Sequence, residues 1–268
     1  MYSSNRKVDR RRVIKSSNSE LARLRMQVTK LQSRVDQLEK ITTDVPFDSR
    51  IRYRERLGRE EFFYLTFRAL SFNQIDGDYV EFGSHGATTF CLAYHQAQLH
   101  KHKAKLWAFD SFQGFPDQVG DQDYHPKWQK GRMSTSLERF HHLCETRGVP
   151  KSAYTVFPGF FSEVLPNLKA PEAPENIALA YIDCDLYSST MDVLDFLTPR
   201  FKHGMILAFD DYHCWSDKQP SGERMAMLEV FDKLDQWELI PHLQFGWHGL
   251  SFVLHDRSLT TSKVRPNY

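Results

Sequence analysis

Short, continuously apolar runs separated by amphipathic segments make up most of the chain after residue 54. The runs Ile177–Ile182 and Met205–Phe209 have apolar side chains at successive positions, which is typical of strands buried on both faces of a parallel sheet. Between them, Thr190–Pro199 carries apolar residues at helical spacing. The pattern therefore predicts a strand, a helix and a parallel strand joined by a right-handed crossover.

The same alternation predicts an α/β fold for residues 54–258, with a doubly wound and mostly parallel sheet of seven strands. The expected strands are Asp78–Phe82, Leu106–Phe109, Tyr154–Phe157, Ile177–Ile182, Met205–Phe209, Glu238–Leu243 and Leu250–Leu254. The expected helices are Arg54–Phe72, Thr88–His100, Thr135–Arg147, Thr190–Pro199 and Glu223–Gln236. Glycines join the last two strands, which we expect to form a hairpin at the edge of the sheet, the last strand being antiparallel.

A different pattern occupies the N-terminal part of the chain. Apolar residues recur there at alternating spacings of three and four, which is a heptad seam: Leu21, Leu24, Val28, Leu31, Val35 and Leu38. Opposite charges flank the seam, so we expect a homo-oligomer formed through residues 21–38; the alternative is that this helix packs on its own globular domain. The expected divisions outside that domain are a basic disordered arm (1–18), a coiled-coil helix (19–41), a linker (42–53) and a C-terminal tail (259–268).

Composition narrows the class of protein. The formal net charge is +1, but residues 1–40 hold eleven Lys/Arg against four Asp/Glu, so the globular part carries an acidic excess and we expect no nucleic-acid partner. The four cysteines form no C-x-x-C motif, which argues against a zinc ribbon or a disulfide framework and favours a reduced, cytoplasmic setting. No apolar run reaches the length of a membrane span, and no signal peptide is expected.

Two pairs of carboxylates follow two of the predicted strands. Asp183 and Asp185 come after Ile177–Ile182, and Asp210 and Asp211 come after Met205–Phe209. Because the carboxyl ends of parallel strands meet at one edge of a sheet, the four side chains are expected to gather there, where a divalent cation such as Mg²⁺ would offset their repulsion. The alternative is that aspartates after strands only cap helices or form turns.

A glycine turn follows the first predicted strand and precedes a helix. Backbone N–H groups between Gly83 and Gly86 could therefore face an anionic or polar ligand, although G-x-x-G alone is more often a simple tight turn than a cofactor loop. Asp110 ends the second predicted strand, where an acidic residue can bind the hydroxyls of a ribose. The following segment, Ser111–Arg132, is long and turn-rich, which is typical of either a functional loop such as a lid or a disordered one.

Five motifs in this order resemble those of class I S-adenosylmethionine (SAM)-dependent methyltransferases, and specifically the macrocin O-methyltransferase-like (TylF-type) enzymes that methylate sugar hydroxyls. The motifs are GDYVEFGSHG, AFDSFQGFP, PGFFSEVLP, YIDCDLYSST and ILAFDDYH. The resemblance covers about Arg54–Leu254 and leaves the N-terminal helix outside. It implies a Rossmann-like fold, SAM and Mg²⁺ as cofactors, and a sugar-containing acceptor with a vicinal diol, in a glycan, a glycoside or a nucleotide sugar.

The resemblance also implies roles for individual residues. Those expected to contact SAM are Glu81, Gly83, Ser84, Gly86, Asp110, Ser111, Phe112 and Asp183. Mg²⁺ would be bound by Asp183, Asp210 and Asp211, and Asp183 would also be the general base, with Asp185 as the alternative. Catechol O-methyltransferase has a catalytic lysine three residues after its first metal-binding aspartate, where this chain has Leu186. The role of His85 in the glycine turn stays open.

Three other functions compete with this interpretation. A glycosyltransferase would use Asp183-Cys184-Asp185 as a D-x-D motif that binds a metal and a sugar nucleotide, but it leaves the glycine turn, Asp110 and the second acidic pair unexplained. A nicotinamide-dependent oxidoreductase would use the turn and Asp110 but has no use for four carboxylates. A catalytically silent scaffold of methyltransferase fold predicts that some ligands are lost, whereas all are present in the sequence.

Overall fold

A computed structural model describes residues 26–29, 31–32, 47–118 and 120–259 of the chain. The chain divides into two compact units, Met1–Tyr53 and Arg54–Tyr268, and the second contains the sheet. Residues 26–29 and 31–32 are helical. The expected basic arm, most of the heptad seam and nearly all of the C-terminal tail lie outside the described residues, so the coiled coil stays a prediction.

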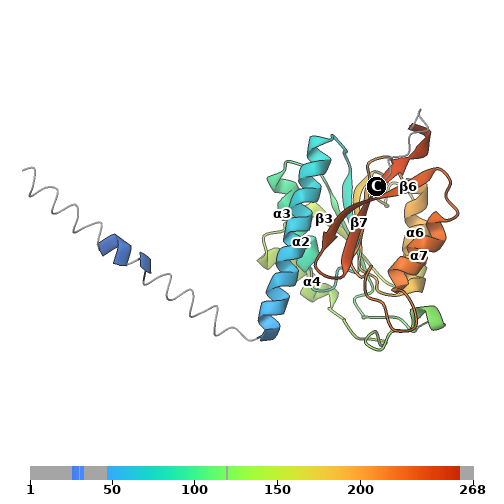
Figure 1. Cartoon of the computed structure of the whole chain (residues 1–268), viewed down its shortest axis with the longest axis horizontal. Coiled ribbons are helices and arrows are strands. Elements are labelled where there is room, and N and C mark those ends of the chain that lie inside the picture. Colours follow the sequence, from blue (N-terminus) through green and yellow to red (C-terminus); the bar gives the residue numbers. More distant parts are fainter. Residues whose placement is uncertain (1–25, 30, 33–46, 119, 260–268) are drawn as a thin grey trace, which may run out of the picture. The chain divides into compact units, whose positions relative to one another are not determined.

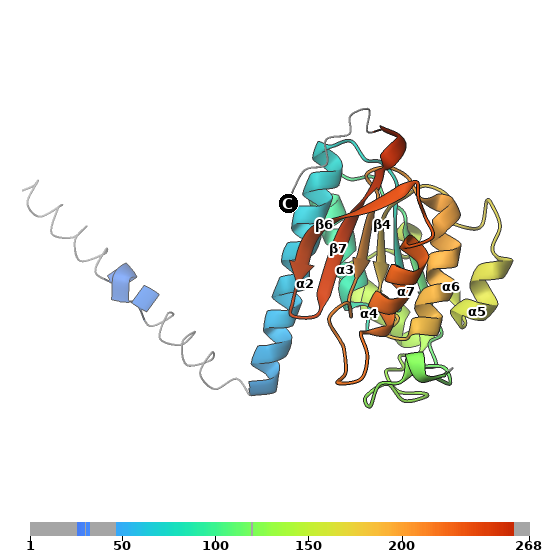
Figure 2. The same ribbon diagram turned by 45° about the vertical axis from the view of Figure 1, so that its right-hand side comes forward.

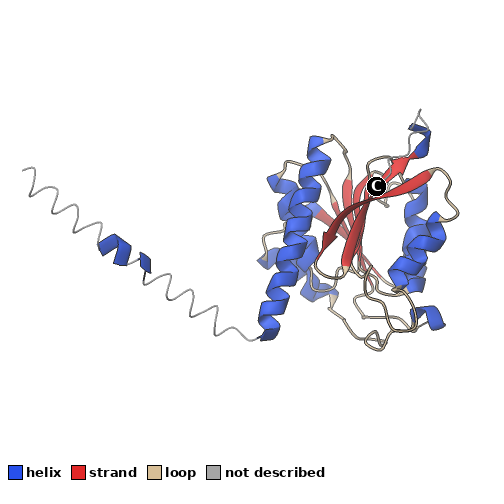
Figure 3. Cartoon of the chain, viewed as in Figure 1, coloured by secondary structure: helices blue, strands red, loops and turns tan. Residues whose placement is uncertain are grey.

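Seven strands form one sheet, in the order β3-β2-β1-β4-β5-β7-β6 (Figures 1 and 3). The strands are β1 (Asp78–Phe82), β2 (Leu106–Asp110), β3 (Tyr154–Pro158), β4 (Ile177–Ile182), β5 (Ile206–Phe209), β6 (Trp237–Phe245) and β7 (Gly249–Asp256). The first five are parallel to one another, β7 is antiparallel to β5, and β6 pairs with β7 as an edge hairpin. The predicted doubly wound, mostly parallel sheet is confirmed.

Helices cover both faces of this sheet, because alternate strand residues point to opposite sides (Figure 2). One face packs against α2 (Phe47–Phe72), α3 (Thr88–Leu99) and α4 (Leu137–Thr146). The other packs against α5 (Phe161–Val164), α6 (Tyr187–Leu197) and α7 (Gly222–Phe231). In β4, for example, Tyr181 faces the first group and Ile182 the second, and both are fully buried.

Helix boundaries differ from the expected ones by three residues or more at three places. Helix α2 begins at Phe47, directly after Pro46, inside the stretch that the sequence analysis had expected to be a linker. No proline or glycine follows Pro46 before Gly58, so the helix continues without a break. Helix α6 begins at Tyr187 rather than Thr190, and α7 ends at Phe231, well before Gln236. Within the described parts of the chain, no helix has the length and apolar character needed to cross a membrane.

Candidate functional site

Gly83 brings the loop after β1 against the loop after β4. Its φ of +92° is in the left-handed region, and a Cβ at this position would lie 1.9 Å from the carbonyl oxygen of Asp183. A side chain is therefore excluded on two grounds, backbone conformation and space. Because β1 and β4 are neighbours in the sheet, the glycine turn and the first acidic pair lie side by side.

A cavity of about 340 Å³ opens at this carboxyl edge of the sheet, between the loops that follow β1, β2, β3 and β4. Four of the residues expected to bind SAM line it, namely Gly83, Asp110, Ser111 and Asp183. Other lining residues come from segments to which the sequence analysis assigned no role, including Phe160 and Phe161 after β3 and Ser188, Ser189 and Asp192 on α6. His85, whose role was left open, also lines the cavity.

Backbone N–H groups of two different loops hold the Asp110 carboxylate. Its Oδ2 accepts a hydrogen bond from the backbone N–H of His85 at 2.8 Å, and its Oδ1 accepts one from the N–H of Phe112 at 2.6 Å. Burial raises the pKa of this carboxyl above its ordinary value, although these hydrogen bonds oppose the shift. Each carboxylate oxygen has a second lone pair, so the group can still accept hydrogen bonds from a ligand with two adjacent hydroxyls.

Glu81 does not line the cavity. It is fully buried, its Oε1 accepts a hydrogen bond from the Thr89 hydroxyl at 2.8 Å, and its Oε2 accepts one from the Tyr79 hydroxyl. Burial raises its pKa to about 8, although these two hydrogen bonds lower it. Three further residues expected to contact SAM are also absent from the cavity wall: Ser84, Gly86 and Phe112.

Three carboxylates converge next to the cavity. Asp183, Asp185 and Asp211 each have an oxygen within 4.8 Å of the others, and each is partly buried. Burial, followed by repulsion from neighbouring carboxylates, holds the pKa values of Asp183 and Asp185 well above the ordinary range. The backbone of Asp185 is left-handed, with φ +63°. The acidic pairs after β4 and β5 are thus brought together, as the sequence predicted.

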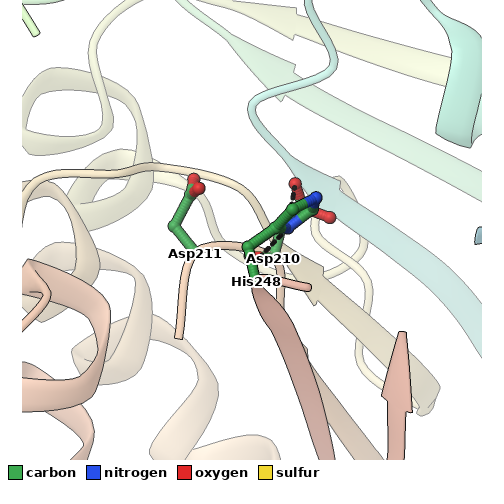
Figure 4. A group of neighbouring side chains, drawn as sticks. All are labelled: Asp210, Asp211 and His248. Atoms are coloured by element: carbon green, nitrogen blue, oxygen red, sulfur yellow. Dashed lines mark hydrogen bonds and ion pairs between the residues drawn. The ribbon is translucent and has the colours of Figure 1, made fainter. Parts of the chain in front are cut away.

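Asp210 is in a different environment from Asp211 (Figure 4). Its two oxygens pair with Nε and Nη2 of Arg59 on α2, at 3.0 and 2.6 Å, and one also accepts a hydrogen bond from the Tyr181 hydroxyl. Nδ1 of His248 lies 2.5 Å from the Asp210 carbonyl oxygen and 3.6 Å from its carboxylate. Burial favours the neutral carboxyl, but Arg59, His248 and the Tyr181 hydroxyl together outweigh this effect, so the pKa of Asp210 lies below its ordinary value.

The three residues expected to bind Mg²⁺ fall into two overlapping groups, and in each group the ligand atoms lie within 4.8 Å of one another: Asp183, Asp185 and Asp211 in one, and Asp210, Asp211 and His248 in the other. Asp210 also has Arg59 as its counter-charge. Arg59 gave no signal in the sequence, because it stands in a helix with many charged residues and meets a partner 151 positions away. Glu223 was also missed, although its carboxylate contacts both acidic loops.

The long loop after β2 is fixed to the edge of the site. Asp123 accepts hydrogen bonds from the backbone N–H and the hydroxyl of Ser188, at 2.8 and 2.7 Å, and so caps the start of α6. The side-chain amide of Gln219 donates to the carbonyl of Tyr124 at 2.9 Å. Residues Gly114–Asp117 of this loop line the cavity. The loop therefore forms one wall of the cavity.

Comparison with known proteins gives a family match over most of the chain. Residues 5–226 match the family model described as Macrocin-O-methyltransferase (TylF). The match includes residues 19–41, which the motif resemblance had left outside, and it ends within α7.

Curated relatives match over shorter stretches. An 8-demethyl-8-(2,3-dimethoxy-alpha-L-rhamnosyl)-tetracenomycin-C 4'-O-methyltransferase from Streptomyces olivaceus is 33% identical over 147 residues, which are 52% of this chain and 54% of the relative. A demethyldecarbamoylnovobiocin O-methyltransferase from Streptomyces niveus is 28% identical over 170 residues, 60% of this chain and 63% of the relative. The chain thus spans between half and two thirds of the length of these relatives.

Solved structures agree with the fold. The O-methyltransferase NovP superposes with a TM-score of 0.60 and 26% identity, over 75% of this chain and 80% of that one. CalS11, a calicheamicin methyltransferase, superposes with a TM-score of 0.63 over 83% of this chain and 91% of that one. Its identity of 23% makes the second likeness one of fold.

Proposed function

Because the chain belongs to the macrocin-O-methyltransferase (TylF) family, we propose that it transfers a methyl group from SAM to a hydroxyl of a sugar. The observation that carries the proposal is the cavity in which the Gly83 turn and Asp110 adjoin the acidic cluster. The part of the cavity with the Gly83 turn and Asp110 suits a nucleoside, and the part next to the acidic cluster suits a diol beside a cation. The two curated relatives, by their names, are O-methyltransferases, one of them acting on a rhamnosyl compound.

In this proposal Asp110 binds the ribose hydroxyls of SAM. Gly83 and Ser111 border the same part of the cavity and would bind the donor with it. Ser84, Gly86 and Phe112 would act through the backbone of the two turns, since the N–H of Phe112 already fixes Asp110. Glu81 would act from beneath, through its contact with Thr89 on α3.

We further propose that Asp183, Asp185 and Asp211 hold a Mg²⁺ ion. They fit such an ion, because they are oxygen ligands within 4.8 Å of one another whose mutual repulsion a divalent cation would offset. Asp210, which the sequence also indicated as a ligand, is already paired with Arg59 and therefore needs a cation less than the other three carboxylates do. When bound, the ion would orient two neighbouring sugar hydroxyls and lower the pKa of the one that reacts.

The residues of the chain would then position the reactants and take up a proton. Methyl transfer is an in-line displacement in which the sugar oxygen bonds to the methyl carbon as the carbon–sulfur bond breaks and S-adenosylhomocysteine leaves, so alignment is the main requirement. We assign Asp183 as the base that accepts the hydroxyl proton, because it both borders the cavity and touches the Gly83 turn. Asp185, which also lines the cavity, is the alternative base.

The deciding experiment incubates the protein with methyl-labelled SAM, Mg²⁺ and a panel of antibiotic glycosides, nucleotide sugars and glycans. We expect Mg²⁺-dependent transfer of label to an acceptor with a vicinal diol, and SAM binding by calorimetry. Asp183→Asn should bind SAM normally and lose turnover, because its amide cannot take the proton. Binding of a sugar nucleotide without any binding of SAM would instead favour a D-x-D glycosyltransferase, and binding of SAM without transfer to any acceptor would favour a silent scaffold.

We also propose that the protein forms a homo-oligomer through residues 21–38, on the basis of the heptad seam. Deleting residues 1–41 should lower the number of subunits per particle, obtained by light scattering as the measured mass divided by the mass of one truncated chain. An unchanged number of subunits would assign self-association to another surface or exclude it.

A further inference from the structure

A fifth carboxylate lies beside the acidic cluster, and it faces the backbone of the two acidic loops. Glu223, in the first turn of α7, has no exposed surface. Its Oε1 accepts hydrogen bonds from the N–H groups of Cys184 and Asp185, at 3.0 and 3.3 Å. Its Oε2 accepts one from the N–H of Asp211 at 2.9 Å. One side chain therefore bridges the loop after β4 and the loop after β5.

The start of α7 is shaped to bring this side chain in. At Gly222, a Cβ would lie 2.4 Å from the backbone nitrogen of Tyr187 and 2.7 Å from the carbonyl oxygen of Asp185, so only glycine allows the helix to approach so closely. The Ser221 hydroxyl accepts from the N–H of Arg224 at 3.2 Å and donates to the carbonyl of Tyr212 at 3.0 Å, which fixes the first turn of the helix. Glycine and cap together place Glu223 between the loops.

A carboxylate at this position has an electrostatic cost that an apolar side chain would avoid. Glu223 lies near Asp211 and Asp185, and burial and the charge of Asp211 both oppose its ionisation. Three backbone N–H groups reduce that cost, and they use both oxygens as acceptors. A glutamine could serve only one of the two loops, because its amide nitrogen would face an N–H group of the other. The arrangement therefore requires two acceptor oxygens on one side chain.

We propose that Glu223 is a positioning residue that sets the separation of the two acidic loops, so that Asp185 and Asp211 reach one cation. This inference rests on the proposed function, since it concerns the metal site of that reaction. Asp185 and Asp211 stand on the two loops that the Glu223 side chain joins, so this bridge fixes the distance between the loops. The carboxylates of Asp185 and Asp211 are left to face each other and the ion.

The test compares the full-length Glu223→Gln and Glu229→Gln variants with the wild type. Glu229 lies on the same helix but is exposed, where it contacts Tyr187 and Lys233, so it is a matched control. Binding of Mn²⁺ to the ligand-free protein is measured from the electron paramagnetic resonance signal of the free ion, and SAM affinity is measured by calorimetry. We expect E223Q to lower Mn²⁺ affinity by about 10–100-fold, as loss of a supporting partner of metal ligands typically does, with SAM affinity unchanged.

Activity gives a second readout. In E223Q, high Mg²⁺ concentrations should restore most of the methyl transfer, so that the metal concentration for half-maximal rate rises more than kcat falls. A variant that binds Mn²⁺ as tightly as wild type would overturn the role of Glu223 and leave the proposed function standing. A wild type that binds SAM but no Mn²⁺ would overturn the metal site and this inference together. If E223Q does not fold, Glu223→Asp takes its place, because it keeps the charge but is too short to reach both loops. It should lower Mn²⁺ affinity and leave SAM affinity unchanged. A Glu223→Asp variant with wild-type Mn²⁺ affinity would also overturn the role of Glu223.

Discussion

Replacing Arg59 with methionine tests the ion pair that connects α2 to the loop after β5. Methionine keeps much of the length and apolar contact of the arginine side chain but removes its charge. The Asp210 carboxylate, whose side chain is only 3% exposed, would then keep the Tyr181 hydroxyl and His248 as partners but no guanidinium. The variant therefore isolates the contribution of the charge.

The expected cost follows from the burial of the pair. Removing one partner of a buried ion pair typically destabilises a protein by about 3–5 kcal/mol, because the other charge is left uncompensated. In the wild type, the pKa of Asp210 is lowered despite burial. The ionised carboxylate therefore stabilises the protein at any pH above the ordinary aspartate pKa near 3.8, and this stabilisation is lost as the pH falls through the lower pKa of the folded state. Without Arg59, only His248 and the Tyr181 hydroxyl oppose the effect of burial, so the pKa of Asp210 rises and the deficit of R59M should grow between pH 5.5 and pH 8.

Urea unfolding at pH 5.5 and pH 8, followed by tryptophan fluorescence, measures this deficit. Arg56→Met is the control, because Arg56 is exposed on the same helix and its loss should change stability by less than about 0.5 kcal/mol. The double variant R59M/D210N removes the uncompensated charge and should be more stable than R59M at pH 8. A deficit that is equal at both pH values, or a double variant no better than R59M, would refute the reasoning.

Three further predictions concern the site. Asp110→Ala should weaken SAM binding by about 10–100-fold in calorimetry, since it removes charge-assisted hydrogen bonds to the ribose, and unchanged affinity would exclude that role. Glu81→Gln should be more stable than wild type at pH 8 by up to roughly 5 kcal/mol and about equally stable at pH 5. The pKa of Glu81 is raised to about 8, so the stability of the wild type falls as the pH rises from the ordinary pKa of a glutamate toward 8. If urea unfolding gave the same dependence of stability on pH for both proteins, this would be contradicted. Mg²⁺ should raise the melting temperature more at pH 8 than at pH 6, since Asp183 and Asp185, whose pKa values are raised, must lose protons to bind it; EDTA should abolish the difference.

The fold was predictable because its signals are local. Continuous apolar runs mark the strands, and the chirality of the crossovers leaves few ways to arrange them. The start of α6 was not predictable in the same way, because its cap comes from Asp123, which lies 65 positions before Ser188 in the chain. The early start of α2 at Phe47 was missed because polar residues after Pro46 resemble a linker, although none of them interrupts a helix.

The candidate site was predictable only in outline. Acids at the ends of β4 and β5 could be placed at one edge from topology alone, and the structure brings them there. Their partners could not be placed, because Arg59 and Glu223 reach them from α2 and α7 through contacts between segments far apart in the sequence. The sequence therefore indicates that carboxylates gather, while the structure is needed to tell which of them is already neutralised.

The two adjacent aspartates after β5 show why this distinction matters. Alternation along β5 directs Ala208 and Asp210 to the face covered by α2, whereas Phe209 and Asp211 face the side of α6 and α7. Asp210 meets Arg59 and has a lowered pKa, while Asp211 lies among carboxylates and has a raised one, owing to burial and then to Asp210. One acid of the pair is thus balanced within the protein. The other lies within 4.8 Å of the carboxylates of Asp183 and Asp185, which is why we propose Asp211 as a ligand of the cation.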